Sequence, residues 1–473
     1  MNEKLAQALD HIQEKKLAEA AVARNKHRHW FLKTAAAILL VVFLLNFNLP
    51  NIPIFITAKA VSTASGSRKP ARPDRDDYDT FEEFRAVLDT YDAARKKEEA
   101  GVAAALANLN GFFTRTTAAY AAQDSTENRV FSPVNAYISL AALAEVTDGE
   151  SRQQILTALN TPDLETLRFQ VGAIWEDVYK DNGNETSVLA SSLWLDEKLT
   201  YRQQAMDNLA LWYYTSVFQK DLSSRSADRA LTGWITNNTG GLLKSKTSGA
   251  AFPDQAVLTL ASTVYFQSKW SSQFSAAKNT TGIFHAPAGD RQVTYMNQQD
   301  ESEYYWTLDY GAARLWLKNN CSMWFFLPDE DKTVEDVLSN GTYLELLLPG
   351  SGTEDNSKYL KINWSVPKFD VGSSADLSQT FQSLGINDVF DPLISDFTAI
   401  TGDSPVYLTG VNQAARVIVD EEGVKAASYI ELPGAGAAEP PEDEIDFVLD
   451  RPFVFVIADS SGIPLFTGVV NEP

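Results

Sequence analysis

The feature that most constrains this chain is a long segment of small, acidic, Gly and Pro residues, 420–451, placed between two β-prone runs. An alternating run, residues 415–419 (ARVIV), leads into it, and a second run, residues 452–457 (PFVFVI), follows it. Loops of this length inside a compact domain are usually functional or disordered. The pattern therefore predicts two strands joined by an exposed loop, with function to be sought in the loop.

The first half of this loop also alternates with a period of two. Every second residue from Val424 to Gly434 is small or apolar, and the residues between them are mostly polar or bulky. That alternation is typical of a strand with one buried face. The segment therefore has the composition of a loop and the pattern of a strand, which makes it a candidate switch; an acidic linker with chance alternation is the plainer alternative.

The residues at the start of the loop resemble the hinge of the serpin reactive-centre loop, which has acids, a Gly and a run of Ala. The hinge residues are Glu421, Glu422, Gly423, Val424, Lys425, Ala426, Ala427 and Ser428. Residues 451–455 (RPFVF) and 465–473 (LFTGVVNEP) look like the two C-terminal strands of that family. Serpin loop insertion is itself a standard example of a protein switch.

Further serpin-like motifs follow in the family's order. They include residues 130–136 (VFSPVNA), 234–241 (WITNNTGG), 257–270 (VLTLASTVYFQSKW) and 366–370 (VPKFD). Pro133 after Ser132 suits the first turn of a helix with a Ser cap. The resemblance implies an α+β serpin fold, with helices around three β-sheets and an exposed reactive-centre loop, over residues 101–473.

Composition limits the chemistry. The formal net charge of -22 argues against nucleic-acid binding and favours basic partners. The single cysteine, Cys321, excludes an intrachain disulfide. No Cys/His metal spacing and no phosphate-binding glycine loop occurs in the sequence, so we expect neither a metal nor a cofactor. No nucleophile–base pair stands out, so we expect a protein that is not an enzyme, and we expect a monomer.

The N-terminal region predicts a membrane anchor. A basic segment, residues 1–33, precedes an apolar segment, residues 34–57. Positive charge on the N-terminal side predicts a single transmembrane helix with residues 1–33 inside the cell and the remainder outside. The strictly apolar part is short and also fits a signal peptide, with cleavage after Ala60 and secretion as the alternative. The arrangement resembles that of bacterial membrane proteins, and residues 58–100 are expected to form a charged linker, helical in its second half.

The resemblance implies a mechanism of inhibition. A serine protease attacks the loop as a substrate and forms an acyl-enzyme, and the cut loop inserts as a new strand in the central sheet. Family spacing from Gly423 places the scissile bond between Ala437 and Ala438, within one or two residues. A small residue before that bond fits a shallow apolar specificity pocket, which predicts elastase-like or subtilisin-like targets.

The chain departs from the family where the sheet has to open. Gln413 stands where most serpins have His, Ser262 where they have Asn, and Asn135 where they have Ser. With Ser132, these residues are expected to form a hydrogen-bonded cluster beneath the sheet. Trp270 is expected where the loop first enters the sheet.

Two other functions remain open. A non-inhibitory serpin would use the fold as a surface binding domain, and Pro433 with the Gly/Ala run after it is the feature that favours this. A protease sensor would signal loop cleavage to residues 1–33.

Overall fold

The computed structural model describes the serpin-like region almost completely. The described residues are 80–121, 126–181, 186–239, 251–253, 255–339, 341–347, 356–403, 405–424 and 441–473. Within these ranges, no helix has both the length and the apolar character needed to cross a membrane. The predicted cytoplasmic segment, residues 1–33, and the predicted anchor, residues 34–57, lie outside the described residues.

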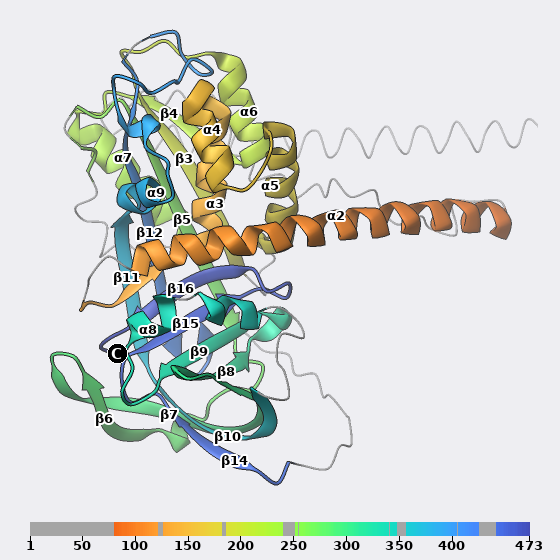
Figure 1. The fold of residues 1–473 in the computed structure, drawn as a ribbon, viewed down its shortest axis with the longest axis vertical. Coiled ribbons are helices and arrows are strands. Elements are labelled where there is room, and N and C mark those ends of the chain that lie inside the picture. The colour runs from red at the N-terminus through yellow and green to blue at the C-terminus, as the bar shows by residue number, and fades with distance from the viewer. Residues whose placement is uncertain are drawn as a thin grey trace, which may run out of the picture. The chain divides into compact units, whose positions relative to one another are not determined.

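Helices and strands are mixed along the chain, with runs of consecutive helices and of consecutive strands (Figure 1). The helices are α2 (Phe81–Ala121), α3 (Pro133–Val146), α4 (Gly149–Ala158), α5 (Leu164–Val178), α6 (Gln203–Tyr213), α7 (Arg225–Asn238), α8 (Val334–Ser339) and α9 (Ser378–Ser383). The strands before the loop are β1 (Arg129–Phe131), β2 (Lys180–Asp181), β3 (Thr186–Asp196), β4 (Thr215–Lys220), β5 (Leu258–Lys269), β6 (Thr280–Ala286), β7 (Gly289–Trp306), β8 (Tyr310–Trp316), β9 (Ser322–Pro328), β10 (Ser357–Pro367), β11 (Phe369–Asp376) and β12 (Leu408–Asp420). The last strands are β13 (Gly423–Val424), β14 (Glu444–Val448), β15 (Phe453–Ala458) and β16 (Pro464–Val470).

The strands of the described residues form two hydrogen-bonded sheets, whereas three were expected. The central sheet has the order β11-β12-β13-β5-β3-β2, with β4 also on β3. The second sheet has the order β1-β16-β15-β9-β8-β7-β10-β14, with β6 on β7. The two expected outer sheets are one ladder because β7 is long: its residues 289–295 pair with β6, residues 295–305 pair with β10, and residues 304–306 pair with β8. β5 coincides with the serpin-like motif at residues 257–270.

The core lies between these sheets and is centred on α3. Every residue of α3 is buried, and β15 and β16 are buried along their whole length. Ser132 begins α3, because its hydroxyl accepts a hydrogen bond from the amide of Asn135 and Pro133 occupies the first turn. This is the predicted helix start, and it fixes Ser132 and Asn135 directly under the central sheet.

Helix α2 runs without a break across the expected border between linker and domain at residue 100. Its second half packs on the core through Leu109, Phe112 and Phe113, and it contacts α3, α5, α8 and α9. The stretch between Asp92 and Leu109 consists mainly of Ala, Glu, Lys and Arg, which are strong helix formers, so Gly101 does not end the helix. The second half of the expected linker, from Phe81 onward, and the first helix of the domain are therefore one element.

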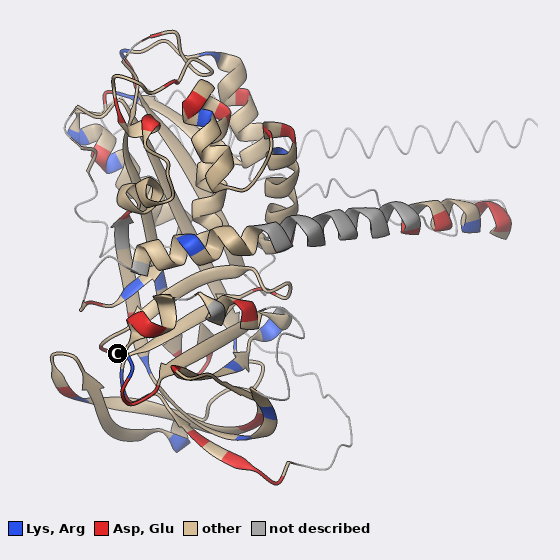
Figure 2. Cartoon of the chain, in the orientation of Figure 1, with Lys and Arg blue, Asp and Glu red and all other residues tan. Residues whose placement is uncertain are grey.

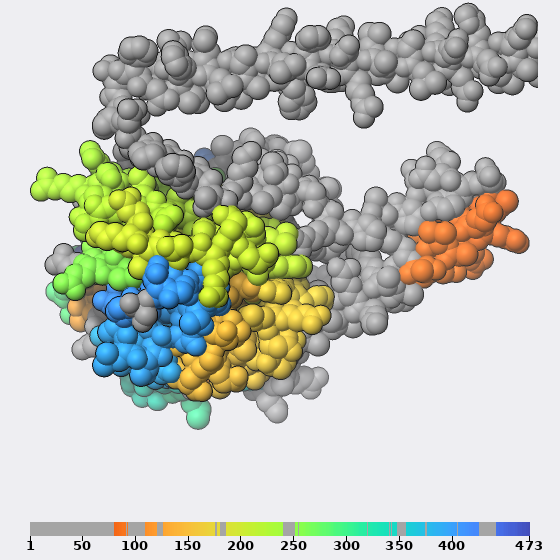
Figure 3. Space-filling view, turned by 90° about the horizontal axis from the view of Figure 1, so that it is seen from above, coloured from red at the N-terminus to blue at the C-terminus, as the bar shows by residue number. Residues whose placement is uncertain are grey.

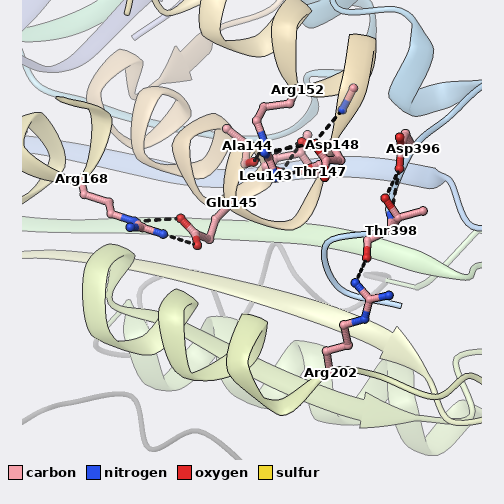
Figure 4. A network of polar contacts seen from close by, with 11 residues as sticks. Leu143, Ala144, Glu145, Thr147, Asp148, Arg152, Arg168, Arg202, Asp396 and Thr398 are labelled. Carbon is pink, nitrogen blue, oxygen red and sulfur yellow. Dashed lines mark hydrogen bonds and ion pairs between the residues drawn. The ribbon is translucent and has the colours of Figure 1, made fainter. Parts of the chain in front are cut away.

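A polar network joins the end of α3 to its neighbours (Figure 4). The Glu145 carboxylate, which is buried, accepts two hydrogen bonds from the Arg168 guanidinium of α5, at 2.6 and 3.0 Å. It also accepts bonds from Asn208 and Tyr213 of α6, at 2.7 and 3.0 Å. Because these donors satisfy the buried carboxylate, the network holds α3, α5 and α6 in one arrangement.

The segment that follows α9 lies beside the helices that follow β1 on one face of the domain (Figure 3) and is bonded to α4. The Asp148 amide donates to the Asp396 carbonyl at 2.9 Å, and the Gln154 side chain accepts from the amides of Asn387 and Asp388. Arg202 donates to the Thr398 carbonyl, as Figure 4 also shows. This end of the central sheet is therefore tied down, and the opposite end carries the loop.

Candidate functional site

The candidate site is the place where β12 and β5 separate. The two strands are parallel neighbours from Leu408 opposite Leu258 to Ala414 opposite Thr263. Beyond this point β13 lies between them, with Val424 paired to both Val419 and Ser268. In the described register, residues 415–418 of β12 have no partner on β5. The sheet is thus joined at both ends and open over four residues between them.

The chain reaches β13 through a tight turn after β12. The Asp420 carboxylate accepts hydrogen bonds from the amides of Glu422 and Gly423, at 2.9 and 3.3 Å. Gly423 has a φ of 148°, and a Cβ atom there would lie 2.4 Å from the Ser268 carbonyl oxygen. Only glycine therefore allows the backbone to pass this close to β5.

Two hinge residues are consequently already part of the sheet. The loop was expected to stay out of the sheet until it is cut, but Gly423 and Val424 form strand pairs on both sides, and Val424 is buried. The pairing is possible because β5 extends past its last contact with β12 and offers Ser268 and Lys269 as partners. The remaining hinge residues, 425–428, lie outside the described residues, as do Ala437 and Ala438.

Trp270 lies directly beside this turn. Its indole nitrogen donates to the Asp420 carbonyl at 2.8 Å, and its amide donates to the Glu422 carbonyl at 3.2 Å. The side chain is fully buried and meets Phe274 edge to face. It therefore holds the end of β12 and the start of the loop against β5.

Glu421 is held by two side chains from other elements. Lys368, which precedes β11, forms an ion pair with it at 2.5 Å, and the Asn279 amide donates to the same carboxylate at 2.6 Å. Partial burial acts to raise the pKa of Glu421, but these two bonds outweigh it and lower the pKa below its usual value. Lys368 was part of a recognised motif without a role, and no signal in the sequence pointed to Asn279.

The expected polar cluster beneath the sheet forms only in part. Gln413 lies opposite Ser262, and both are buried. The Gln413 amide binds the backbone of Ser132 in both directions, accepting from its N–H at 2.6 Å and donating to its carbonyl at 3.1 Å. Among the described residues, the side-chain amide of Asn135 makes no hydrogen bond although it is fully buried. Gln413 reaches the backbone because its side chain is long, so no contact with Asn135 is needed.

Replacing Gln413 with Ala is expected to destabilise the native state by about 1–3 kcal/mol, because it leaves the Ser132 N–H buried without a partner, while the Ser132 carbonyl keeps the bond that it accepts from the Ala136 amide. Urea unfolding monitored by circular dichroism measures the change. The neighbouring Asn412→Ala serves as the matched control, because Asn412 points to the other face of β12 and is partly exposed. Equal midpoints for the two variants would contradict the role given to Gln413.

A sequence profile of the serpin (serine protease inhibitor) family matches residues 107–473. The chain belongs to the serpin family. Members of the family are generally inhibitors of proteases and not catalytic enzymes. The matched region begins inside α2 and includes the whole of the open sheet and its hinge.

Curated serpins and solved structures are similar over most of this domain. Alpha-1-antiproteinase of Callosciurus caniceps is 27% identical over 75% of this chain and 85% of its own length. Plasminogen activator inhibitor 1 of Bos taurus is 27% identical over 73% of this chain and 87% of its own length. The native structure of tengpin, a thermophilic serpin, covers 77% of this chain and 93% of its own with a TM-score of 0.68 at 24% identity, which supports the fold.

Proposed function

We propose that the chain is a suicide-substrate inhibitor of serine proteases that cleave after small residues, of the elastase or subtilisin type. The observation that carries the proposal is the open stretch of the central sheet, which begins where the hinge already lies between β12 and β5. Family membership supports inhibition in general, and the small residues of the loop support the target class.

The open stretch fits the next hinge residues. If the register of Val424 with Val419 and Ser268 is continued, residues 425–428 come to lie opposite 415–418 of β12 and 264–267 of β5. These are the positions at which β12 and β5 do not pair with each other. Insertion up to Ser428 therefore breaks no strand pair, and later residues have to separate pairs such as Ala414 with Thr263.

The side chains that would face inward suit this path. By alternation Ala426 would meet Val417 and Phe266, and Ile430 would lie between Gln413 and Ser262. Val417 and Phe266 belong to the apolar core, so small and apolar inward residues are favoured there. The polar or bulky residues between them would remain on the outer face.

In the proposed reaction the Ser hydroxyl of the protease attacks the carbonyl carbon of Ala437. An ester bond joins the loop to the protease, and the amine of Ala438 leaves with a proton supplied by the protease His. The freed loop then inserts and carries the attached protease with it before water cleaves the ester. The native state would thus be held kinetically and not at its lowest free energy.

The acids in the last part of the 420–451 segment would attract a basic target. Figure 2 shows them along β14 at the edge of the second sheet. Glu442, Asp443, Glu444 and Asp446 are exposed there. Complementary charge mainly raises the rate of association, so we expect faster inhibition of basic proteases at low salt.

We further propose that residues 34–57 anchor the chain in the cell membrane as a single span, with the inhibitory domain outside the cell. The motivation is the basic segment before the apolar one. Cleavage after Ala60 would give a secreted inhibitor instead. The mass of the mature chain isolated from cells distinguishes the two outcomes.

Inhibition is tested by mixing the protein with pancreatic elastase, subtilisin and trypsin. We expect a complex with elastase or subtilisin that survives SDS, and a released peptide that starts at Ala438 or within two residues of it. Trypsin is expected to give no complex, because a small side chain leaves the acid in its pocket unpaired. Clean cleavage by every protease without a complex would contradict the proposal and favour a non-inhibitory binding or sensing role.

A further inference from the structure

A pair of aspartates lies at the contact between α5 and the turn that joins β15 to β16. Asp459 follows the last residue of β15, and Asp177 lies in the last turn of α5. Asp459 is 7% exposed. Its Oδ1 accepts hydrogen bonds from the amides of Ser461 and Ile463, at 3.0 and 2.8 Å. This oxygen is therefore fully used by its own turn.

The second oxygen of Asp459 is buried and lacks a donor. Among the described residues no hydrogen bond reaches Oδ2. Ser461 joins the two carboxyl groups, because its hydroxyl donates to Asp177 at 2.7 Å and its amide donates to Asp459 at 3.0 Å, so the two acids lie close together. Two carboxylates cannot both be ionised at such a contact without strong repulsion, whereas one proton between them turns repulsion into a hydrogen bond.

The surroundings of the two aspartates favour the protonated form of the pair. Asp177 is near the carboxyl end of α5, where the helix dipole disfavours negative charge, and the last turn of α5 contains no basic residue. Among the described residues, Asp177 is the charged side chain that raises the pKa of Asp459. The backbone amides of Ser461 and Ile463, which belong to the turn, donate hydrogen bonds to Asp459. In the part of the chain that the structure describes, the groups that act on Asp459 include no cation.

We propose that Asp177 and Asp459 share one proton in the native fold, and that this proton makes the contact between α5 and the β15–β16 turn sensitive to pH. Asp459 carries the proton and donates it to Asp177, which keeps its bond from Ser461. Loss of the proton leaves two buried or half-buried charges in contact and weakens the hold of the turn on α5. Because α5 is followed directly by β2 and β3 of the central sheet, the contact bears on the sheet as well.

The shared proton determines whether the stability of the native state rises or falls with pH. Burial, and then the Asp177 charge, raise the pKa of Asp459 from 3.8 to about 7. Between these values the native state binds a proton that the unfolded state has lost, so stability falls as pH rises through this window and is level above it. From pH 5 to pH 8 the unfolding constant is therefore expected to rise roughly a hundredfold more than it would without the pair.

The test uses the full chain and two isosteric variants, Asp459→Asn and Asp177→Asn. Each keeps the shape of the pair and replaces the shared proton with an amide donor, so each is expected to flatten the fall of the thermal midpoint between pH 5 and pH 8. The control is Asp391→Asn, because Asp391 also accepts a bond from a loop amide, that of Leu393 at 2.8 Å. This control is expected to follow the wild-type profile.

Infrared difference spectra give a second and direct reading. The wild type is expected to show a protonated carboxyl band at pH 6 that disappears by pH 9, and Asp459→Asn is expected to lack it. Parallel midpoint profiles for wild type and Asp459→Asn, or an unchanged carboxyl band in that variant, would overturn the proposal. If one of the two variants fails to fold, the other still tests the proposal, since the two changes lie on different elements.

Discussion

Replacing Ala426 with Arg is expected to turn the proposed inhibitor into a substrate. In the continued register, residue 426 of the inserted loop would face Val417 and Phe266 in the core, and an unpaired charge buried there costs several kcal/mol. The loop would still be cut, but insertion would be slower than hydrolysis of the ester. Because about 1.4 kcal/mol corresponds to a factor of ten, we expect the number of inhibitor molecules cleaved per trapped protease to rise at least about tenfold.

The same substitution one residue further along provides the control. Residue 427 faces outward by alternation, so Ala427→Arg adds the same charge to the loop but leaves it in water after insertion. We expect this variant to trap elastase nearly as well as the wild type. Gel densitometry of complex and cleaved inhibitor at several molar ratios measures both variants. If both lose the complex equally, the inward face is assigned incorrectly.

Replacing Gly423 with Val is expected to expel the start of the loop from the sheet. A Cβ atom at this position would lie 2.4 Å from the Ser268 carbonyl oxygen and 2.5 Å from the Lys269 Cα atom, and both are backbone atoms that cannot turn away. The φ of 148° is also unfavourable for any residue with a side chain. We expect the amide of Trp270, which now donates to the Glu422 carbonyl, to exchange with solvent at least about ten times faster.

Hydrogen exchange followed by mass spectrometry of the peptide around Trp270 checks this result. Glu422→Ala is the matched control, because the Glu422 side chain is exposed and only its backbone takes part in the turn. The control should exchange as the wild type does. Unchanged protection in Gly423→Val would mean that the pairing of Gly423 with Lys269 does not persist in solution.

Sequence patterns predicted the parts of the fold that local chemistry determines. The run from 257 to 270 is β-branched and apolar and became β5, and the Ser132 cap with Pro133 began α3 as expected. The order of the serpin-like motifs then supplied the topology, because each motif marks one strand or helix of the family's fold. The count of sheets differed, since the length of β7 joins two of them.

The contacts that form the candidate site were harder to predict from sequence patterns. Insertion of Gly423 and Val424 depends on how far β5 extends past β12, and this is set by residues about 150 positions away in the chain. The hold on Glu421 by Asn279 and the meeting of Asp177 with Asp459 join segments that no periodicity relates. Gln413 was expected beneath the sheet near Ser132. That it binds the Ser132 backbone and not the Asn135 side chain depends on the length of its side chain and on how deeply it is buried.

The uninterrupted course of α2 has a consequence for how the domain is presented. An α-helix advances by 1.5 Å and turns by about 100° for each residue, so a residue inserted into a helix rotates the part before the insertion about the helix axis. Insertion of one residue before Leu109 would rotate the first turns of α2 about the helix axis by more than a quarter turn relative to the domain, whereas a seven-residue insertion would nearly restore the original direction. The side of the domain toward which the residues at the start of α2 point is therefore determined by the number of residues in the helix.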